Sequence, residues 1–434
     1  MSTVLFWFRN DLRLHDQLAL HAACGIDTRF LIPVFCLPDL EEQSGWGFAR
    51  IGPQRRAWLG GAVRALSDQL ARLNCPLLVC TGPAATTLPL LARAVGAGSI
   101  VCEDIAAPEE QAQIAALRAA GLTVKTVWQS SLVDPAQLPW ESKDLPASFT
   151  QYRQRLEKAG LRPPAPLAPP STLPPWPAHR AIPAHLVAAA ASLGGNDGPP
   201  DPRSSLAGGQ MLDGAEAAGL ARLARYLARK LPDSYKQTRN QLMGLDYSSK
   251  WSPWLATGAL SARRIVAELN QYEAIHGASD GSYWLWFELL WRDYFRLLHL
   301  QYGARLYGAR GLGQAPLGPH NQRGFERWRL ARTGQPLVDA AMRELMATGY
   351  LSNRLRQVVA SYLIYDLGGD WRAGAAWFES QLIDYDVYSN QGNWLYLAGR
   401  GTDPRGGRRF NVDKQTAEHD PDGAYRECWS QLAP

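Results

Sequence analysis

Cysteine, lysine and long apolar runs are scarce in this 434-residue chain. Its 6 cysteines form no CxxC pair, which argues against both a disulfide framework and a cysteine-ligated zinc site. No apolar run approaches the ~20 residues that span a bilayer. Residues 1–10 lack the basic, apolar and small-residue segments of an export signal. We therefore expect a cytoplasmic protein that binds no membrane and no metal.

Arginine and tryptophan are abundant instead. Arginine supplies 38 of the 45 basic residues, and ten of the 16 tryptophans follow residue 250. Guanidinium groups match the edges of phosphates and carboxylates, which indicates a phosphate-bearing partner, although a GC-rich genome would also raise the arginine content. The tryptophans indicate either a bulky core or a use in stacking and electron transfer.

The first 130 residues alternate between short apolar runs and helical segments. The runs lie at residues 4–8, 30–35, 77–80, 99–102 and 122–127, and the clearest helical segment lies at 55–73. This alternation predicts a parallel α/β sheet that is covered on both faces. The chain contains neither a GxGxxG nor a GxxxxGK[ST] loop, so no dinucleotide or P-loop fingerprint is predicted.

Proline marks the division of the chain. Residues 161–202 hold 12 of the 30 prolines, and such a composition predicts an extended surface connection. From residue 212 onward the apolar periodicity is helical. Helices are expected at 212–231, after Ser261, and at 282–302, 336–349, 353–367 and 371–382. We predict an α/β domain (1–130), a linker (131–211) and an all-helical domain (212–434) that can enclose a ligand.

Polar side chains interrupt the apolar face of the expected 282–302 helix. Glu288, Trp291 and Arg292 are spaced so that they share one face. Burying a charge without a partner is costly, so these groups predict a polar pocket. A surface ion pair beside core tryptophans is the alternative.

The next polar set begins on the 353–367 helix. Asn353, Arg356 and Gln357 share a face of it, and Asp384 and Asp386 follow further along the chain. Two neighbouring carboxylates can transfer protons, but no histidine or metal-ligand cluster accompanies them. Pairing Asp384 with Arg356 would satisfy both charges, so a binding role is favoured over acid–base catalysis.

A turn rich in hydroxyl groups precedes another helical segment. It reads Tyr-Ser-Ser-Lys-Trp-Ser over residues 247–252. Hydroxyls, a lysine and successive backbone N–H groups can hold a pyrophosphate. A serine-rich turn is also a common loop, and the residues alone leave both interpretations open.

Several of these segments occur together in one known family. The chain resembles the photolyase/cryptochrome proteins at residues 6–16, 235–240, 246–253, 288–293, 332–334, 352–357, 382–386 and 393–394. Within the family it is most similar to the DASH cryptochromes, because of residues 247–250, Gln357 and Tyr396. Ordinary pyrimidine-dimer photolyases carry Met and Trp at the last two positions.

The resemblance implies a bent FAD in the helical domain. Arg356 and Asp384 would pair against the isoalloxazine ring, Asp386 would bond to the ring, and Asn390 would face its N5 atom. The implied cofactor-binding set is Tyr235, Ser248, Ser249, Lys250, Trp251, Ser252, Arg292, Asn353, Arg356, Asp384, Asp386 and Asn390.

The resemblance also implies light-driven repair of a flipped-out cyclobutane pyrimidine dimer by electron transfer from excited FADH⁻. Glu288 and Asn353 would bond to the pyrimidines, and Trp291 would stack on them. Gln357 and Tyr396 make the cavity more polar, so single-stranded DNA is the expected substrate. The implied DNA-contacting set is Arg239, Glu288, Trp291, Asn353, Arg354, Gln357 and Tyr396, with the two arginines on phosphates.

Trp394 and Trp371 match the inner two members of the family's electron relay, which photoreduces oxidised flavin. The distal member falls at Gly318. Either another aromatic residue, such as Trp328 or Tyr350, replaces it, or photoreduction is impaired. The implied catalytic set is Trp394, Trp371, Asn390, Glu288 and Trp291.

Residues 108–110, Pro-Glu-Glu, resemble the acidic segment that contacts a folate antenna, which implicates Glu109 and Glu110. Residues 111–113 depart from the family pattern there. We expect a monomer that binds DNA. The alternative from another class is a light-sensing cryptochrome with little or no repair activity; such proteins often carry a long C-terminal extension, which this sequence does not show.

Overall fold

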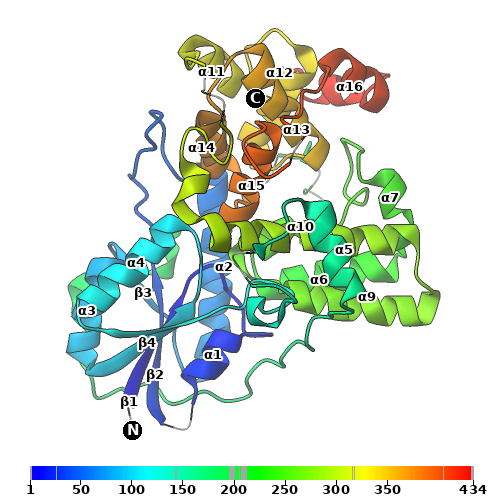
Figure 1. Cartoon of the computed structure of the whole chain (residues 1–434). Coiled ribbons are helices and arrows are strands. Elements are labelled where there is room, and N and C mark those ends of the chain that lie inside the picture. The colour runs from blue at the N-terminus through cyan, green and yellow to red at the C-terminus, as the bar shows by residue number, and fades with distance from the viewer. Residues whose placement is uncertain are drawn as a thin grey trace.

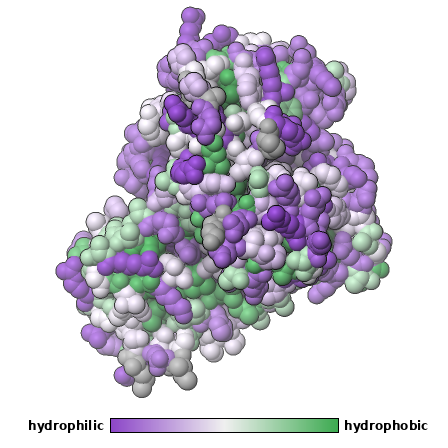
Figure 2. Space-filling view, in the orientation of Figure 1, coloured by the Kyte–Doolittle hydropathy of each residue, from purple (hydrophilic) through white to green (hydrophobic). Residues whose placement is uncertain are grey.

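The computed structural model describes residues 2–431 except 26, 142–143, 195–200, 205, 207–212, 315, 317 and 404. Figure 1 shows two parts, a sheet covered by helices near the N-terminus and a larger helical part. Within the described residues, no helix combines the length and the apolar character needed to cross a membrane. Figure 2 shows hydrophilic residues over much of the visible face, with hydrophobic ones scattered among them.

Five parallel strands form the sheet, in the order β3-β2-β1-β4-β5. The strands are β1 (Ser2–Phe8), β2 (Thr28–Cys36), β3 (Leu78–Cys80), β4 (Ala97–Glu103) and β5 (Thr123–Val127). Each overlaps one of the five predicted apolar runs, so the predicted parallel α/β sheet is confirmed. The chain winds outward from β1 to β3, returns to β4 and winds outward again, which is a doubly wound arrangement.

Alternate residues of β1 enter two different cores, as the two-residue repeat of a strand requires. Val4, Phe6 and Phe8 pack in a cluster with α1 and α2, whereas Leu5 and Trp7 pack in a cluster with α3 and α4. Burial on both faces explains why the strands are apolar almost throughout. The four covering helices are α1 (Leu18–Ala23), α2 (Pro53–Arg72), α3 (Ala84–Val95) and α4 (Pro108–Ala119).

The helical part follows the predicted pattern with one correction. The helix expected at 212–231 is shorter: α6 ends at Ala228, because Lys230 adopts a left-handed φ of 54° and Pro232 follows it. Residue 212 lies outside the described residues. The helices are α6 (Glu216–Ala228), α7 (Tyr235–Thr238), α8 (Ser252–Thr257), α9 (Ala262–His276), α10 (Asp280–Tyr302), α11 (Gln322–Arg329), α12 (Pro336–Thr348), α13 (Asn353–Ser361) with a π-helical turn (Tyr362–Asp366), α14 (Trp371–Gln381), α15 (Val387–Leu397), α16 (Val412–His419) and α17 (Ala424–Cys428).

The stretch predicted as a linker also contains a helix. In α5 (Phe149–Lys158), the side chains of Phe149, Tyr152 and Leu156 are buried in the core of the helical part. Residues 161–175 then run without helix or strand, and none of them is buried, as their proline content predicts. The division of the chain at residues 130 and 211 stays a prediction.

The turn after β1 joins the two parts through buried polar groups. Glu216, at the start of α6, accepts hydrogen bonds from the backbone N–H groups of Leu14 and His15, at 2.8 and 3.1 Å, and from His15 Nδ1 at 2.5 Å. His15 Nε2 in turn accepts the backbone N–H of Ser261 at 3.2 Å. We call this set, Leu14, His15, Glu216 and Ser261, the junction.

We expect Glu216→Ala to lower the free energy of unfolding by about 3–5 kcal/mol, because His15 and two backbone N–H groups would stay buried without their acceptor. The matched control is Asp280→Ala, which removes an exposed pair with Lys236 (2.7 Å) and should cost less than about 1 kcal/mol. Urea unfolding followed by circular dichroism measures both variants. Equal losses in the two would contradict the role of the junction.

The junction also predicts a pH dependence. Burial alone would raise the pKa of Glu216, but its hydrogen bonds with His15 and the backbone N–H groups lower the pKa below the ordinary value of 4.5. A carboxylate with a lowered pKa stabilises the fold above its unfolded pKa, and this stabilisation is lost as the pH falls through the folded pKa. In acid titrations followed by urea unfolding, Glu216→Gln should therefore lose less stability than the unchanged chain; equal losses would contradict this.

Candidate functional site

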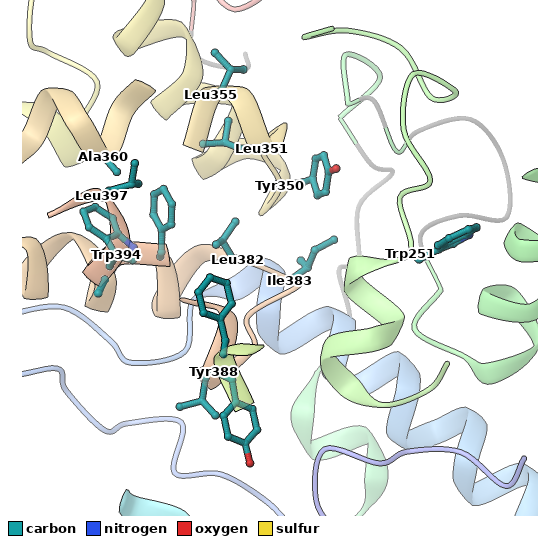
Figure 3. Packing of buried hydrophobic residues seen from close by; sticks show 14 of the residues in the cluster. Trp251, Tyr350, Leu351, Leu355, Ala360, Leu382, Ile383, Tyr388, Trp394 and Leu397 are labelled. Atoms are coloured by element: carbon teal, nitrogen blue, oxygen red, sulfur yellow. The ribbon is translucent and has the colours of Figure 1, made fainter. Parts of the chain in front are cut away.

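A pocket opens between α13, α14, α15 and the loop that joins α14 to α15. Figure 3 shows Trp394 at this place beside Ala360 and Leu397. The predicted residues that line the pocket are Asn353, Arg356, Gln357, Asp384, Asp386, Asn390 and Trp394. The structure thus gathers residues from three separate sequence segments around one space.

The predicted pairing of Arg356 with Asp384 is present. Arg356 Nη2 lies 2.8 Å from Asp384 Oδ2, and Arg356 Nε donates to the carbonyl of Leu351 at 3.0 Å. The side chain of Asp384 is only 1% exposed. Its other oxygen, Oδ1, is buried and accepts no hydrogen bond from any described residue. Buried polar atoms normally have partners, so an N–H or O–H donor on a ligand would complete this site.

Asp386 has two protein partners. Its Oδ1 accepts from the N–H of Ser389 at 2.7 Å, and its Oδ2 lies 2.7 Å from Arg296 Nη2. Burial alone would raise the pKa of Asp386, but Arg296 and Arg292 outweigh burial and hold the pKa at about 2. The sequence analysis did not single out Arg296, although it follows Arg292 by one helical turn on the same face.

The amide residues of the pocket are held at different strengths. Asn390 donates from its side chain to the carbonyl of Ala375 at 3.1 Å. Gln357 accepts from Arg354 Nη1 through a longer contact of 3.4 Å. Asn353, the first residue of α13, is exposed. Asn390 is therefore a fixed part of the wall, while Asn353 is accessible to a ligand.

Arg222 of α6 sets the shape of the turn at 247–252. Its guanidinium donates to the carbonyls of Leu245, Ser248 and Ser249, at 3.2, 3.1 and 3.0 Å, and pairs with Asp246 at 3.1 Å. Arg222 itself is 2% exposed. Arg222 was not among the predicted site residues, because nothing in the local pattern of α6 connects it to a turn more than twenty residues away.

Tyr350 connects this turn to the pocket. Lys250 Nζ lies 3.7 Å from the ring centre of Tyr247 and 4.6 Å from that of Tyr350, and the Arg356 guanidinium lies 5.3 Å from the Tyr350 ring. These are cation–π distances. Burial lowers the pKa of Lys250 well below its ordinary range. The turn and the Arg356–Asp384 pair are therefore neighbours, with the Tyr350 ring between them.

The remaining residues predicted near the turn flank it. Tyr235 and Ser252 begin α7 and α8, and Tyr235 is buried. The Trp251 ring meets Tyr226 edge-on at 5.2 Å. Figure 3 shows Trp251 well apart from Trp394, with Tyr350 between them. The predicted cofactor residues thus span a long site.

A second pocket adjoins Trp291 of α10 and Tyr396 of α15. Phe149 stacks on Trp291, with ring centres 3.8 Å apart and planes at 10°, and Tyr396 meets Trp291 edge-on at 5.8 Å. The Tyr396 hydroxyl accepts from Arg408 Nε at 2.9 Å. One face of Trp291 is therefore covered, and only the opposite face can stack on another ring.

Two residues with separate predicted roles form a pair. Arg239 Nη1 lies 2.5 Å from Glu288 Oε1, and the Arg239 guanidinium also lies 4.2 Å from the ring centre of Trp284. Both members are partly exposed. Arg354 similarly donates to Asn240 Oδ1 at 3.0 Å. A DNA phosphate or base at this surface would compete with these internal contacts.

Arg292 does not line the pocket around Arg356. It donates to the carbonyl of Ser130 and lines a small polar cavity that also contains Asn10 and Glu103. Burial lowers the pKa of Arg292 to about 10. Its contribution to the pocket is the charge that it adds to the surroundings of Asp386.

The predicted antenna residues lie near the boundary between the two parts. Glu109 pairs with Arg50, which also lies 2.8 Å from Glu379 Oε1 of α14. Burial raises the pKa of Glu110 above its ordinary range. Glu109 is therefore already paired with Arg50, and Arg50 also contacts the helical part through Glu379.

The tryptophans of the predicted relay are both buried. Trp394 meets Phe378 edge-on at 5.2 Å and Trp328 at 6.4 Å. In the described part of the chain, no aromatic ring packs against Trp371. Gly318 lies exposed in a loop, where a side chain would meet nothing within 4 Å. Of the two suggested replacements, Trp328 contacts the relay, whereas Tyr350 lies between the cations described above.

The site as a whole can hold an anionic ligand that carries a planar ring. It offers cations on the side of Lys250 and Arg356, an unpartnered buried acceptor on Asp384, and the buried ring of Trp394. No histidine lines the pocket around Arg356. This composition favours binding and electron transfer over hydrolysis.

Two family models match the chain. A model described as DNA photolyase matches residues 4–171, and a model described as the FAD binding domain of DNA photolyase matches residues 284–432. Together they cover most of the sheet and most of the helical part.

Known proteins are similar over nearly the whole chain. A protein named Cryptochrome DASH from Gloeobacter violaceus is 43% identical over 440 residues, which cover 99% of this chain and 85% of that protein. The crystal structure of the Synechocystis sp. cryptochrome is 43% identical, with a TM-score of 0.92 over 98% of this chain and 88% of that one. A class III photolyase from Agrobacterium tumefaciens is 28% identical, with a TM-score of 0.79 over 99% and 86%.

Proposed function

Because the chain belongs to the photolyase/cryptochrome family, and within it to the DASH cryptochromes, we propose that it uses FAD and blue light to repair cyclobutane pyrimidine dimers, preferably in single-stranded DNA. When bound, FAD supplies the photochemistry, in which one electron passes to the dimer and returns after the ring has split. The protein's task is to hold the cofactor and the dimer together and to exclude water.

The observation that carries this proposal is the unpartnered Oδ1 of Asp384 beside the Arg356 guanidinium. One edge of a flavin ring carries an N–H donor between two carbonyl acceptors, which matches a carboxylate acceptor next to a guanidinium donor. Arg356 would also stabilise the negative charge of the reduced ring. The residues present therefore fit a flavin.

The other proposed cofactor contacts lie in the turn at 247–252 and around Asn390. Lys250 and the hydroxyls of Ser248, Ser249 and Ser252 would hold the pyrophosphate and the ribityl chain. The side-chain amide of Asn390 donates an N–H to the carbonyl of Ala375. Its side-chain oxygen would therefore accept a hydrogen bond from an N–H at the flavin N5 position. The proposed cofactor set also includes Tyr235, Trp251, Asn353 and Asp386, with Arg292 acting on Asp386.

The dimer would enter between Trp291 and the helix α13. Trp291 offers one face, because Phe149 covers the other. On DNA binding, the ion pair between Glu288 and Arg239 would break. Glu288 would then bind a pyrimidine, and Arg239 would bind a flanking phosphate. In a single strand no base pair has to be opened, so the cost of flipping is smallest there.

Binding to single-stranded DNA that carries a dimer should weaken with salt, and each phosphate contact contributes a slope of about 0.7 in log affinity against log salt. Arg239→Ala and Arg354→Ala should each reduce the slope by about that amount. Arg72→Ala, which removes an exposed arginine of α2, is the matched control. Fluorescence anisotropy at several salt concentrations measures the slope, and an unchanged slope in both variants would contradict the assignment.

A folate antenna would bind at Glu109 and Glu110, close to the contact that Arg50 makes with the helical part. Arg50 pairs with Glu109 and with Glu379, so it would have to share Glu109 with the pterin ring. Folate released on denaturation, measured by its fluorescence in the unchanged protein and in Glu109→Ala, tests this site.

The test of the main proposal uses the FAD-loaded full chain and oligonucleotides with one thymine dimer. Under blue light we expect repair of the single strand at least about tenfold faster than repair of the duplex, because duplex opening costs a few kcal/mol. No repair should occur in the dark. Bound flavin without repair of either substrate would contradict the proposal and favour a light-sensing role.

A further inference from the structure

One face of α10 carries aromatic side chains that are only partly buried. Trp284, Phe287 and Trp291 follow one another at three- and four-residue intervals, so they share this face, and Glu288 lies among them. All four side chains are partly exposed, whereas the leucines of the same turns are buried. We call these four residues the α10 stripe. Accessible aromatic rings of this kind are a typical platform for unpaired bases.

The α10 stripe is continuous with the proposed dimer site. Trp291, at one end, is the ring proposed to stack on the dimer. Trp284, at the other end, lies two helical turns away, about 10 Å along the helix axis. The rings of Trp284 and Phe287 have their centres 4.4 Å apart, and Phe287 meets Phe149 edge-on at 5.0 Å. Aromatic rings thus connect the dimer site to Trp284.

Arg239 lies over the far end of the α10 stripe. It directly follows α7, which packs against α10 (Figure 1). Its guanidinium lies 4.2 Å from the ring centre of Trp284, and its Nη1 lies 2.5 Å from Glu288 Oε1. One arginine therefore contacts both a ring and a carboxylate of the stripe. When Arg239 moves to a phosphate, it releases both of them together.

We propose that Trp284 binds the unpaired base next to the dimer by stacking, after Arg239 has left its ring. The inference rests on the proposed repair of dimers in single-stranded DNA, and it assigns a further residue to substrate recognition. A base about 10 Å from the dimer site cannot stay in a duplex stack, where the nucleotides of one strand advance by about 3.4 Å. A single strand leaves the stack without breaking base pairs, so the α10 stripe favours single strands.

Three cations lie along the α10 stripe, and each is paired with a carboxylate. The pairs are Arg153 with Glu157, Lys236 with Asp280, and Arg239 with Glu288. The Arg153 guanidinium also lies 5.8 Å from the ring centre of Phe287. Salt weakens DNA binding through the phosphates. The contribution of the Trp284 ring should therefore be the same at low and at high salt, unlike that of Arg239.

The first test uses the unchanged, FAD-loaded chain and single strands that carry one thymine dimer. An abasic site replaces the base directly 5′ or directly 3′ of the dimer, and fluorescence anisotropy measures the affinity. We expect one of the two abasic strands to bind about tenfold more weakly, which is within the range for one base stacked on an aromatic ring. If neither abasic site weakens binding, the inference is wrong.

Variants then assign the loss to Trp284. In Trp284→Leu the abasic strand should bind within about twofold of the intact strand, because the ring that holds the base is gone. The matched control, Trp286→Leu, changes a partly exposed tryptophan on another side of α10 and should keep the difference of about tenfold. Trp284→Phe keeps a smaller ring and should reduce the difference to about threefold. FAD content and urea unfolding check that each variant folds.

The outcomes separate this inference from the proposed function. An equal effect of the abasic site in Trp284→Leu and in the unchanged chain would overturn the role of Trp284, while dimer repair stands. A contribution of Trp284 that disappears at high salt would also overturn it. A flavin-loaded chain that neither binds nor repairs the strand with the dimer would overturn the proposed function and this inference with it.

Discussion

Arg356→Ala should purify with FAD content lowered by at least about tenfold. Removing one partner of a buried ion pair costs about 3–5 kcal/mol, and every 1.4 kcal/mol changes a binding constant about tenfold. Asp384, whose side chain is 1% exposed, would lose the charge partner that lies 2.8 Å from it. The expected result is a colourless, less stable protein, and visible absorbance together with urea unfolding measures it.

Two further variants distinguish a specific loss of flavin binding from a general loss of fold stability. Arg372→Ala removes another Arg–Asp pair of similar length, 2.6 Å to Asp370, but the Arg372 side chain is 38% exposed and does not line the pocket, so flavin should be retained. Arg356→Lys keeps the charge but loses the planar fork, so it should bind FAD with intermediate affinity. If Arg356→Ala retained all of its flavin, the assignment of the Arg356–Asp384 pair would be wrong.

Gln357→Met combined with Tyr396→Trp should raise the rate of duplex repair relative to single-strand repair by about five- to tenfold. Flipping a dimer out of a duplex costs a few kcal/mol, and aromatic stacking recovers about 1–3 kcal/mol per base. Single-strand repair should change little, because its opening cost is already small. Light-driven repair rates on both substrates, with dimer affinity measured alongside, test this expectation.

The structure adds a control for this experiment. The Tyr396 hydroxyl accepts from Arg408 Nε, so any change at residue 396 that removes the hydroxyl also releases this N–H for DNA, while Arg408 Nη2 keeps its pair with Asp403 at 3.1 Å. Tyr396→Phe releases the Arg408 Nε–H without enlarging the aromatic surface. If Tyr396→Phe raises duplex repair as much as Tyr396→Trp does, phosphate contact rather than stacking limits the duplex reaction. An unchanged ratio in the flavin-replete double variant would place the restriction elsewhere.

The parts of the fold that depend on local patterns could be predicted from the sequence. The five strands follow from apolar runs buried on both faces, and the helices α10, α12, α13 and α14 follow from their apolar periodicity and from caps such as Ser352. The Arg356–Asp384 pair was also predictable, because two charges in apolar surroundings need each other.

Contacts between distant segments could not be predicted in this way. Arg222 holds the turn at 247–252, which follows it by more than twenty residues in the sequence. Phe149, in a segment whose composition predicts a linker, covers one face of the Trp291 ring. The family resemblance implied that Glu288 binds a pyrimidine and Arg239 a DNA phosphate. Without DNA, the two side chains form an ion pair with each other. Single-sequence patterns carry no information on which of several possible partners lies nearest in space.

The junction has a consequence for how the chain is made. His15 and Leu14 leave the ribosome about two hundred residues before Glu216, and the contact of His15 with Ser261 spans 246 positions. Domains generally form during synthesis from the N-terminus onward, so the sheet can assemble while the polar turn after β1 is still solvated. Its dehydration must wait for α6 and α9. A turn near the start of the chain is therefore buried only after residue 261 has been translated.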